Sequence, residues 1–186
     1  INSGTFQGMA SLEKITLPLL WNCINTSGSI GIFGYVFGTA SSETEETTYQ
    51  KYSGSSSAYG YYLIPKTLRT VTITQETYIA YGAFYNCSFL TEINIPDTVT
   101  SINSYAFYNC SGLTDFEIKG SETSLGGYAF ANCSNLETVE FSEGLKTIGS
   151  YAFFECIKLN DVELPSGLTT INDRAFYRCR AFTEIN

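Results

Sequence analysis

Apolar positions recur along this chain with a period of 23 residues, most clearly between residues 79 and 182. In each period an aliphatic residue is followed after five positions by the Phe of an Ala-Phe pair, after three more by Cys, and after another three by Leu or Phe. The Phe positions are Phe84, Phe107, Phe130, Phe153 and Phe176, and the Cys positions are Cys87, Cys110, Cys133, Cys156 and Cys179. So many columns in register identify an internal repeat, which decides the fold.

The end of each repeat predicts a short β-strand. An L-x-x-I-x-I pattern, as in Leu90, Ile93 and Ile95, alternates apolar and polar residues, which is typical of a strand with one buried face. One 23-residue unit is too small to bury that face alone, so successive units should stack as a parallel ladder with strands about 4.8 Å apart. The Ala-Phe-x-x-Cys segment has helical spacing and predicts a single helical turn. The Phe column should form the centre of the core.

The first third of the chain fits the same frame with two insertions. Residues 1–6 align with residues 102–107, and Tyr35-Val36-Phe37 stands in place of Tyr-Ala-Phe in a second unit. The insertions lie near 18–31 and 38–67, and the longer one, rich in Ser, Thr, Gly and Tyr, is predicted to be a surface loop. We therefore expect one solenoid domain over 1–186, with about seven turns. The frame begins and ends in mid-unit, which predicts a segment of a longer array.

The unit P-x-x-(V/L)-T-x-I-x-x-Y-A-F-x-x-C-x-x-L-x-x-(I/V)-x-(I/L) resembles the BspA-like leucine-rich repeat. The resemblance covers nearly the whole chain apart from the two insertions. It implies a right-handed leucine-rich-repeat solenoid with a parallel β-ladder and short helical turns. It also implies a cell-surface or secreted protein of the kind found in gut and oral bacteria, with a role in binding or adhesion and no catalytic residue.

Composition and charge exclude several classes of function. The 10 basic and 18 acidic residues give a net charge of −8, which is opposite in sign to the basic footprint of a nucleic-acid binder. The absence of His removes the commonest general base and the commonest transition-metal ligand. No segment approaches the roughly 20 apolar residues of a membrane-spanning helix, so we expect no membrane insertion. We expect a monomer without a cofactor or a metal.

The six cysteines have two interpretations. A secreted protein with an even number of Cys suggests a disulfide framework. However, side chains stacked in one column point the same way from units about 4.8 Å apart, whereas a disulfide needs converging Cβ atoms. Met9 fills the same column and cannot form a bridge, and Cys23 lies in an insertion. Buried free thiols are therefore the favoured prediction.

The outward positions of the last five predicted strands are mostly acidic, and none of them is basic. We call these positions the acidic stripe: Glu92, Asp115, Glu117, Glu140, Asp161, Glu163 and Glu184. Like charges across a ladder oppose stability, so the stripe either attracts a basic partner or a cation, or serves as a solvated face that maintains solubility. Calcium is a less favoured variant, because no D-x-D-x-D-G loop wraps the oxygen ligands.

Tyrosines are the second group of candidate contact residues. The long insertion carries Tyr49, Tyr52, Tyr59, Tyr61 and Tyr62. In the repeats, Tyr105, Tyr128 and Tyr151 precede the Ala-Phe pairs, and Tyr85, Tyr108, Phe154 and Tyr177 follow them. Exposed tyrosines are rigid, amphipathic contact groups for sugars or proteins. Packing between turns with the hydroxyl in water is the favoured interpretation for the repeat tyrosines, and both interpretations stay open for those of the insertion.

The sequence leads to two hypotheses of function. The first is a non-catalytic cell-surface or secreted binding or adhesion module whose partner is a protein or glycan of a host or neighbouring cell. The second is a structural spacer that holds another domain away from the cell surface. A glycosidase is disfavoured, because stacked carboxylates supply the separation but neither a closed pocket nor different environments for acid and base.

Overall fold

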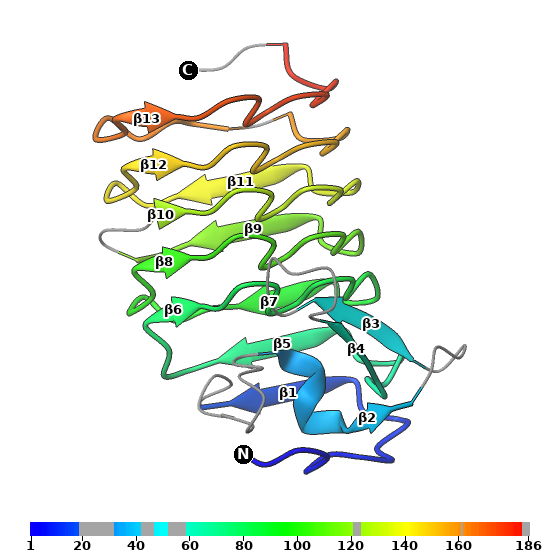
Figure 1. Ribbon diagram of the computed structural model, residues 1–186. Helices are drawn as coiled ribbons and strands as arrows, with labels where there is room; N and C mark the ends of the chain where they lie inside the picture. Colours follow the sequence, from blue (N-terminus) through cyan, green and yellow to red (C-terminus); the bar gives the residue numbers. More distant parts are fainter. Residues whose placement is uncertain (19–31, 42–46, 52–58, 121–123, 161, 184–186) are drawn as a thin grey trace.

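The computed structural model describes residues 1–18, 32–41, 47–51, 59–120, 124–160 and 162–183. Each repeat forms one flat coil, and the coils stack so that the two termini lie at opposite ends (Figure 1). The strands of successive coils pair in parallel, which makes the molecule a β-solenoid. The predicted solenoid class is therefore confirmed.

The L-x-x-I-x-I segments up to residue 141 form the first ladder, as predicted, whereas residues 162–164 of the next unit do not form a strand. Its strands are β1 (Lys14–Leu17), β5 (Thr70–Ile73), β7 (Glu92–Asn94), β9 (Asp115–Ile118) and β11 (Thr138–Phe141). Val71 lies opposite Ile93, and Phe116 opposite Val139, so the pairing register follows the repeat. The ladder consists of two sheets, β1-β5-β7 and β9-β11, because hydrogen bonding is interrupted between β7 and β9.

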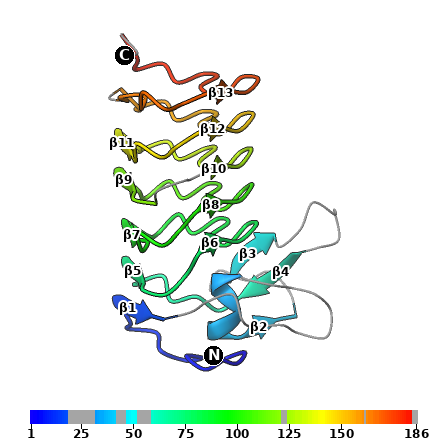
Figure 2. The ribbon, with the colours of Figure 1, turned by 90° about the vertical axis from the view of Figure 1, so that its left-hand side faces the viewer.

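A second parallel ladder runs beside the first, and the sequence pattern did not predict it. It comprises β6 (Tyr78–Ile79), β8 (Ser101–Ile102), β10 (Ser124–Leu125), β12 (Thr147–Ile148) and β13 (Thr170–Ile171). Its aliphatic column is buried from Ile79 to Ile148, whereas Ile171 in the last of these coils is 47% exposed. The coils from β6 to β11 thus each contribute two short strands to the backbone pairing (Figure 2).

The Ala-Phe-x-x-Cys segments form tight turns, and the predicted helical turn is wrong. Each turn closes with a hydrogen bond from residue i+3 to residue i, as between the Cys87 N–H and the Phe84 carbonyl, at 3.1 Å. Left-handed residues on both sides of the Phe position interrupt any helix, since a right-handed helix requires negative φ. The first corner comprises Gly82, Tyr105, Tyr128, Tyr151 and Arg174, and the second corner comprises Asn86, Asn109, Asn132, Glu155 and Arg178.

The Phe column is the centre of the core, as predicted. Phe84, Phe107, Phe130 and Phe153 are fully buried. Neighbouring rings from Phe84 to Phe176 stack with centroids 4.9 to 5.4 Å apart and interplanar angles of 20° or less. One Phe in each coil therefore packs against the same residue in the coils on either side.

The second unit connects the Phe of the first unit to the Phe column of the later coils, and it uses two different phenylalanines to do so. Its 3₁₀ helix η1 (Phe33–Phe37), the one helix within the described residues, carries two phenylalanines. The Phe37 ring centroid lies 6.0 Å from that of Phe6, and the Phe33 centroid lies 5.0 Å from that of Phe84. The predicted alignment of Phe37 therefore holds toward the first unit. In the contact with the third unit, Phe33, which lies one helical turn before Phe37, takes the place of Phe37.

The cysteines of the repeat are free, as predicted. Those from Cys87 to Cys156 are buried, Cys179 is half-buried, and Cys23 lies outside the described residues. The thiols of Cys110, Cys133, Cys156 and Cys179 donate hydrogen bonds of 3.0 to 3.2 Å to the Phe carbonyls of the preceding coils. The Cys column thus links successive coils through side-chain hydrogen bonds as well as by packing.

The long insertion forms a small antiparallel sheet, so the prediction of a surface loop over 38–67 is wrong for the described residues. Its strands are β2 (Thr39–Ala40), β3 (Thr48–Lys51) and β4 (Tyr59–Tyr62), in the order β2-β4-β3. This insert sheet lies on one side of the solenoid, and the first ladder lies on the opposite side (Figure 2). The insertion near 18–31 lies almost entirely outside the described residues.

Candidate functional site

A buried glutamine joins the insert sheet to the repeats. The Gln50 side chain on β3 is fully buried. Its Oε1 accepts a hydrogen bond from the Gly34 N–H at 2.8 Å, and its Nε2 donates to the Tyr85 carbonyl at 3.1 Å and to Cys87 Sγ at 3.3 Å. These bonds fix the insert sheet against the turns. A Cβ on Gly34 would lie 2.6 Å from the Gln50 Oε1, so Gly34 is needed for this approach.

The tyrosines of the insert sheet cluster beside this anchor. The Tyr49 ring centroid lies 5.1 Å from that of Tyr59, 5.7 Å from that of Tyr61 and 6.1 Å from that of Tyr85. Tyr85 belongs to the repeats, so the inserted tyrosines continue directly into the repeat tyrosines. Tyr62 is 3% exposed because it faces the core, and we remove it from the candidate contact residues. Tyr52 lies outside the described residues.

The repeat tyrosines form two columns along the turns. In the inner column the rings of Tyr105, Tyr128 and Tyr151 stack almost parallel, with centroids 4.8 to 5.0 Å apart. In the outer column Tyr85 stacks on Tyr108 at 4.6 Å, and Phe154 stacks on Tyr177 at 5.9 Å. Together with the insert sheet the columns form the aromatic surface: Tyr49, Tyr59, Tyr61, Tyr81, Tyr85, Tyr105, Tyr108, Tyr128, Tyr151, Phe154 and Tyr177.

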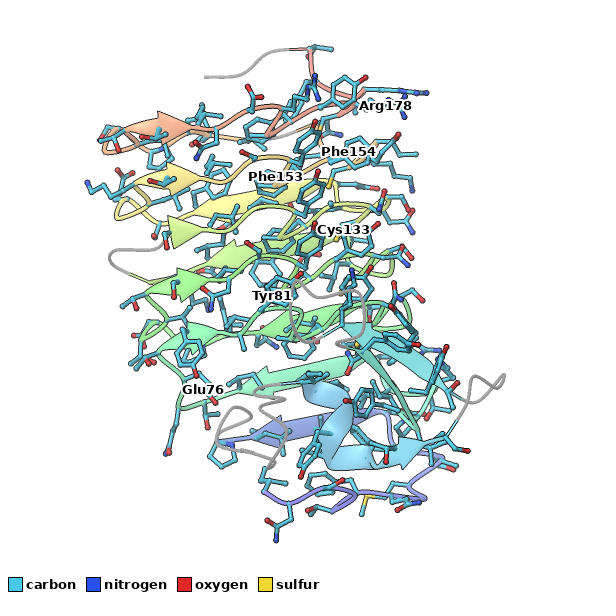
Figure 3. All side chains as sticks on the ribbon, in the orientation of Figure 1. Glu76, Tyr81, Cys133, Phe153, Phe154 and Arg178 are labelled. Atoms are coloured by element: carbon cyan, nitrogen blue, oxygen red, sulfur yellow. The ribbon has the colours of Figure 1, made fainter. Side chains whose placement is uncertain are left out.

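Contacts between the two columns make this surface continuous. The Tyr105 and Tyr108 centroids are 5.7 Å apart, and those of Tyr151 and Phe154 are 5.8 Å apart. Figure 3 shows Tyr81 low in the stack and Phe154 in the upper coils. Most of these rings are half-buried, which confirms that the repeat tyrosines pack between turns, while their edges remain accessible.

The inner-column tyrosines adopt a backbone conformation that favours glycine. Tyr105, Tyr128 and Tyr151 have φ of 57 to 61°, where Gly82 stands one coil earlier with φ of 62°. A left-handed residue with a side chain costs about 1–2 kcal/mol, while an aromatic pair contributes about 0.5–1.5 kcal/mol beyond burial. Stacking therefore offsets much of the backbone strain, and the rings are held in fixed orientations.

Four tyrosines of the aromatic surface hold their hydroxyl protons more tightly than a free tyrosine does. Burial, followed by the proximity of other tyrosines, raises the pKa of Tyr49, Tyr81, Tyr85 and Tyr105 above the ordinary value. Their hydroxyls therefore stay protonated and can both donate and accept hydrogen bonds.

The acidic stripe lies on the first ladder, away from the aromatic surface. Glu92, Asp115, Glu117, Glu140 and Glu163 are exposed, whereas Asp161 and Glu184 lie outside the described residues. Glu117 and Glu140 stand directly opposite each other on β9 and β11. Glu117 forms an ion pair of 3.0 Å with Lys119, which relieves part of this repulsion.

Two features of the stripe bear on its chemistry. Hydrogen bonds from the Asn94 amide at 2.9 Å and the Thr70 hydroxyl at 3.0 Å lower the pKa of Glu92. A groove of about 440 Å³ beside β11 is lined by the exposed carboxylates of Glu140, Glu143 and Glu163, among others. In the described part of the chain, no three Asp, Glu or Cys side chains are grouped so that they could hold a metal ion.

The sequence profile of the BspA type leucine-rich repeat region matches residues 57–186 in six copies. The chain belongs to this family. The matched BspA-type repeats include the coils that carry both tyrosine columns and β4 of the insert sheet. The comparison with curated proteins found no match.

Solved structures of other leucine-rich-repeat proteins share the fold of this BspA-type solenoid. The T. pallidum leucine-rich repeat protein is 30% identical, with a TM-score of 0.61 over 64% of this chain and 56% of its own. A leucine-rich cell surface protein from Faecalibacterium prausnitzii is 23% identical, with a TM-score of 0.52 over 77% of this chain and 53% of its own. A Bacteroides ovatus protein is 21% identical, with a TM-score of 0.50 over 79% of this chain and 53% of its own. The chain thus spans little more than half the length of these proteins.

Two functional features of this BspA-type solenoid escaped the sequence analysis. The left-handed corners were indicated by Gly82, which occupies the column of Tyr105, and by the Asn that precedes three of the five repeat cysteines. No sequence pattern indicated the Gln50 anchor, because it joins residues 16 to 37 positions apart. Within the described residues, no helix has the length and apolar character needed to cross a membrane.

Proposed function

We propose that this BspA-type solenoid is a non-catalytic binding or adhesion module that contacts a protein or glycan of a host or neighbouring cell through its aromatic surface. The observation that carries the proposal is the junction between insertion and repeats. Gln50 and the Tyr49–Tyr85 ring contact join three inserted tyrosines to the two repeat columns. An insertion that only extended a turn would need neither a buried anchor nor tyrosines continuous with those of the repeats.

The physical properties of the aromatic surface suit recognition. Tyrosine supplies a large apolar area and a polar group at a low cost in conformational entropy. Stacking within the columns already fixes the rings, so binding requires little further ordering. Neutral hydroxyls along the edge can satisfy the polar groups of a protein or a glycan.

An extracellular location and the absence of catalysis belong to the same proposal. The structurally similar Faecalibacterium prausnitzii protein is described as a cell surface protein, which supports a cell-surface or secreted location for this chain. General acid and base need environments that separate their pKa values. Glu140, Glu143 and Glu163 are all exposed, and none of them lies in an enclosed pocket. We assign the acidic stripe to solvation, with recognition of a basic partner as the alternative that the experiment below separates.

Binding to a panel of host-surface proteins and glycans tests the proposal. Exposed Tyr59 contacts Tyr49 and Tyr61 on the insert sheet without contributing to the anchor, so Tyr59→Ser together with Tyr61→Ser should weaken any binding about tenfold or more. The control is Glu117→Lys with Glu140→Lys, which reverses the charge of the stripe and should leave binding within about twofold. Loss of binding in the control alone would assign recognition to the acidic stripe.

A structural spacer is the second candidate, and the continuity of the stack favours it. The unbroken Phe column and the second ladder join all coils from β6 to β13 into one rod, which suits a spacer as well as a binding surface. A panel in which no protein or glycan binds the wild-type chain would favour this alternative.

A further inference from the structure

The outer aromatic column has one missing member. Tyr85 and Tyr108 stack below the gap, Phe154 and Tyr177 stack above it, and Ala131 occupies the position between the two pairs. Because neighbouring coils are about 4.8 Å apart, the two pairs are separated by roughly twice that distance. One face of the Phe154 ring packs on Tyr177, while the other face lacks an aromatic neighbour in this column.

The side-chain contacts between successive second-corner residues are also interrupted in the coil of Ala131. The Asn109 amide donates to Asn86 Oδ1 at 2.9 Å, and Arg178 forms an ion pair of 2.5 Å with Glu155. Asn132 stands between these two pairs, and its side-chain amide has no hydrogen-bond partner among the described residues. Asn132 is only half-buried, so this amide is available to a ligand.

Asn132 and Phe154, which border these interruptions, both line a shallow depression of about 370 Å³, whereas Ala131 itself is fully buried beside it. The depression is lined by Asn109, Asn132, Ser134, Phe154, Glu155 and Ile157. We propose that this depression is a subsite for one neutral sugar residue of a glycan. The inference rests on the proposed binding function and adds to it the class of ligand and the place where that ligand is recognised.

The chemistry of the lining selects a neutral sugar. Phe154 and the 41% exposed Ile157 offer apolar surface to the C–H groups of a sugar ring. The Asn132 amide and the Ser134 hydroxyl both donate and accept hydrogen bonds, as sugar hydroxyls do. Arg178 compensates the charge of Glu155, so the site has no unpaired charge to bind an acidic sugar or a charged peptide. The small volume and open shape suit one residue of a chain rather than a whole folded partner.

The stacked tyrosines cannot supply such a site themselves. In the inner column each ring face of Tyr128 is covered by Tyr105 or Tyr151, so only ring edges and hydroxyls remain for a ligand. The coil of Ala131 is the place where the outer column leaves a ring face without a stacked neighbour. This places the subsite within the aromatic surface and not beside it.

Nuclear magnetic resonance titration of the isotope-labelled chain tests the subsite. The probes are neutral tetrasaccharides of hexose and N-acetylhexosamine, sialylated forms of the same chains, and short basic and acidic peptides. A neutral tetrasaccharide should shift the Asn132 amide and Phe154 ring resonances, and affinity should fall about tenfold or more in Phe154→Ala. Ile157→Ser, which removes the exposed apolar side chain from the lining, should also weaken binding several-fold.

Matched variants separate recognition from folding. Asn132→Gly keeps the left-handed corner, since Gly82 shows that glycine adopts this conformation, and should weaken neutral-sugar binding about fivefold. The control is Tyr78→Ala, which removes a half-buried ring on β6 that belongs neither to the depression nor to the aromatic surface, and which should leave sugar affinity unchanged. Equal losses in Phe154→Ala, Ile157→Ser, Asn132→Gly and Tyr78→Ala would indicate unfolding, which circular dichroism detects independently.

The outcomes distinguish the sugar subsite from the wider binding function of the aromatic surface. Unchanged sugar affinity in Ile157→Ser and Asn132→Gly would overturn the subsite. So would shifts at Asn132 and Phe154 that only sialylated chains or peptides produce. If the subsite variants keep full binding while the double variant Tyr59→Ser with Tyr61→Ser loses binding, the aromatic surface is supported and the subsite is contradicted. If no protein, glycan or peptide binds the wild-type chain, both proposals fail.

Discussion

At the scale of single residues, each coil is organised by three positions: the Phe ring, the Cys thiol and the left-handed corners. The Phe and Cys positions were predictable because the same residue recurs every 23 positions. The corners were missed, because the first corner is occupied by Gly, then by three Tyr and then by Arg, and this variety hides the common backbone conformation. The residue type therefore predicts the structure well at positions selected by burial, and poorly at positions where only the backbone angle φ is constrained.

Removing one ring of the Phe column should destabilise the whole stack. Phe130 and Phe153 are fully buried between two stacked neighbours. Truncation of either one to Ala should lower the free energy of unfolding by about 3–5 kcal/mol, as measured by urea denaturation. Tyr177→Ala is the control, because Tyr177 is 47% exposed. A loss equal to that of the control would contradict the assignment of Phe to the core.

At the first corner, a Gly variant should be more stable than the corresponding Ala variant, although Gly usually destabilises a protein relative to Ala. Tyr128 has φ of 57°, so Tyr128→Ala keeps the backbone strain and loses both stacked rings. Tyr128→Gly loses the rings and also the strain, and should be more stable than Tyr128→Ala by about 1 kcal/mol. Thermal or urea denaturation of the two variants gives this difference directly. An Ala variant at least as stable as the Gly variant would mean that the corner is not left-handed.

Stability should fall at alkaline pH because of the buried thiols. Burial raises the pKa of Cys133 from 9.0 to about 12, and Cys110 and Cys156 are also raised. The folded chain therefore holds these protons after the unfolded chain has lost them. The stabilising contribution is complete below pH 9 and is lost as the pH rises toward about 12.

Comparison of the wild type with Cys133→Ala isolates one thiol. The variant should be less stable at pH 7 but should lose less stability per pH unit between pH 9 and 11, by up to about 1.4 kcal/mol. Urea denaturation across this pH range supplies both slopes, and parallel slopes would contradict the burial of the Cys133 thiol. Alkylation of the unreduced, denatured chain should add six labels, Cys23 included.

At the scale of elements, the strands predicted from the alternating pattern formed as far as residue 141, but residues 162–164 carry the same pattern and form no strand. The strands of the second ladder contain only two residues each, too few for alternation to be visible, although their buried aliphatic column was identified. The insert sheet was missed because its composition is typical of a loop. Its order depends on the contact of Gln50 with the repeats, which no local pattern encodes.

The insert sheet should depend on Gln50. Gln50→Leu leaves the Gly34 N–H and the Tyr85 carbonyl without their side-chain partner, and each lost bond to a buried group costs about 1–3 kcal/mol. Hydrogen exchange of β3 and β4 should accelerate strongly, while that of β10 and β12 should be unchanged. The control is Lys51→Ala, which changes the next residue of β3 on its half-buried side. Unchanged protection of β3 in Gln50→Leu would show that other contacts hold the sheet.

At the scale of the whole molecule, the solenoid separates two kinds of surface. The first ladder lies on one side, and the insert sheet lies on the other (Figure 2). The exposed acidic side chains belong to the first ladder, and the aromatic rings belong to the turns and the insert sheet. The sequence predicted both sets of residues, but it could not place them relative to each other. That placement depends on the path of the coil between the two ladders. The central claim of our account is that the aromatic side receives the partner.

Mass-spectrometric footprinting of the chain with a partner captured from the panel tests this claim most directly. Hydroxyl radicals modify exposed tyrosines, and carbodiimide coupling modifies exposed carboxylates, so one experiment covers both sides. We predict that the partner lowers the modification of Tyr59, Tyr61 and Tyr177 several-fold and leaves Glu117 and Glu140 unchanged. Protection of Glu117 and Glu140 with unchanged modification of the tyrosines would contradict the account.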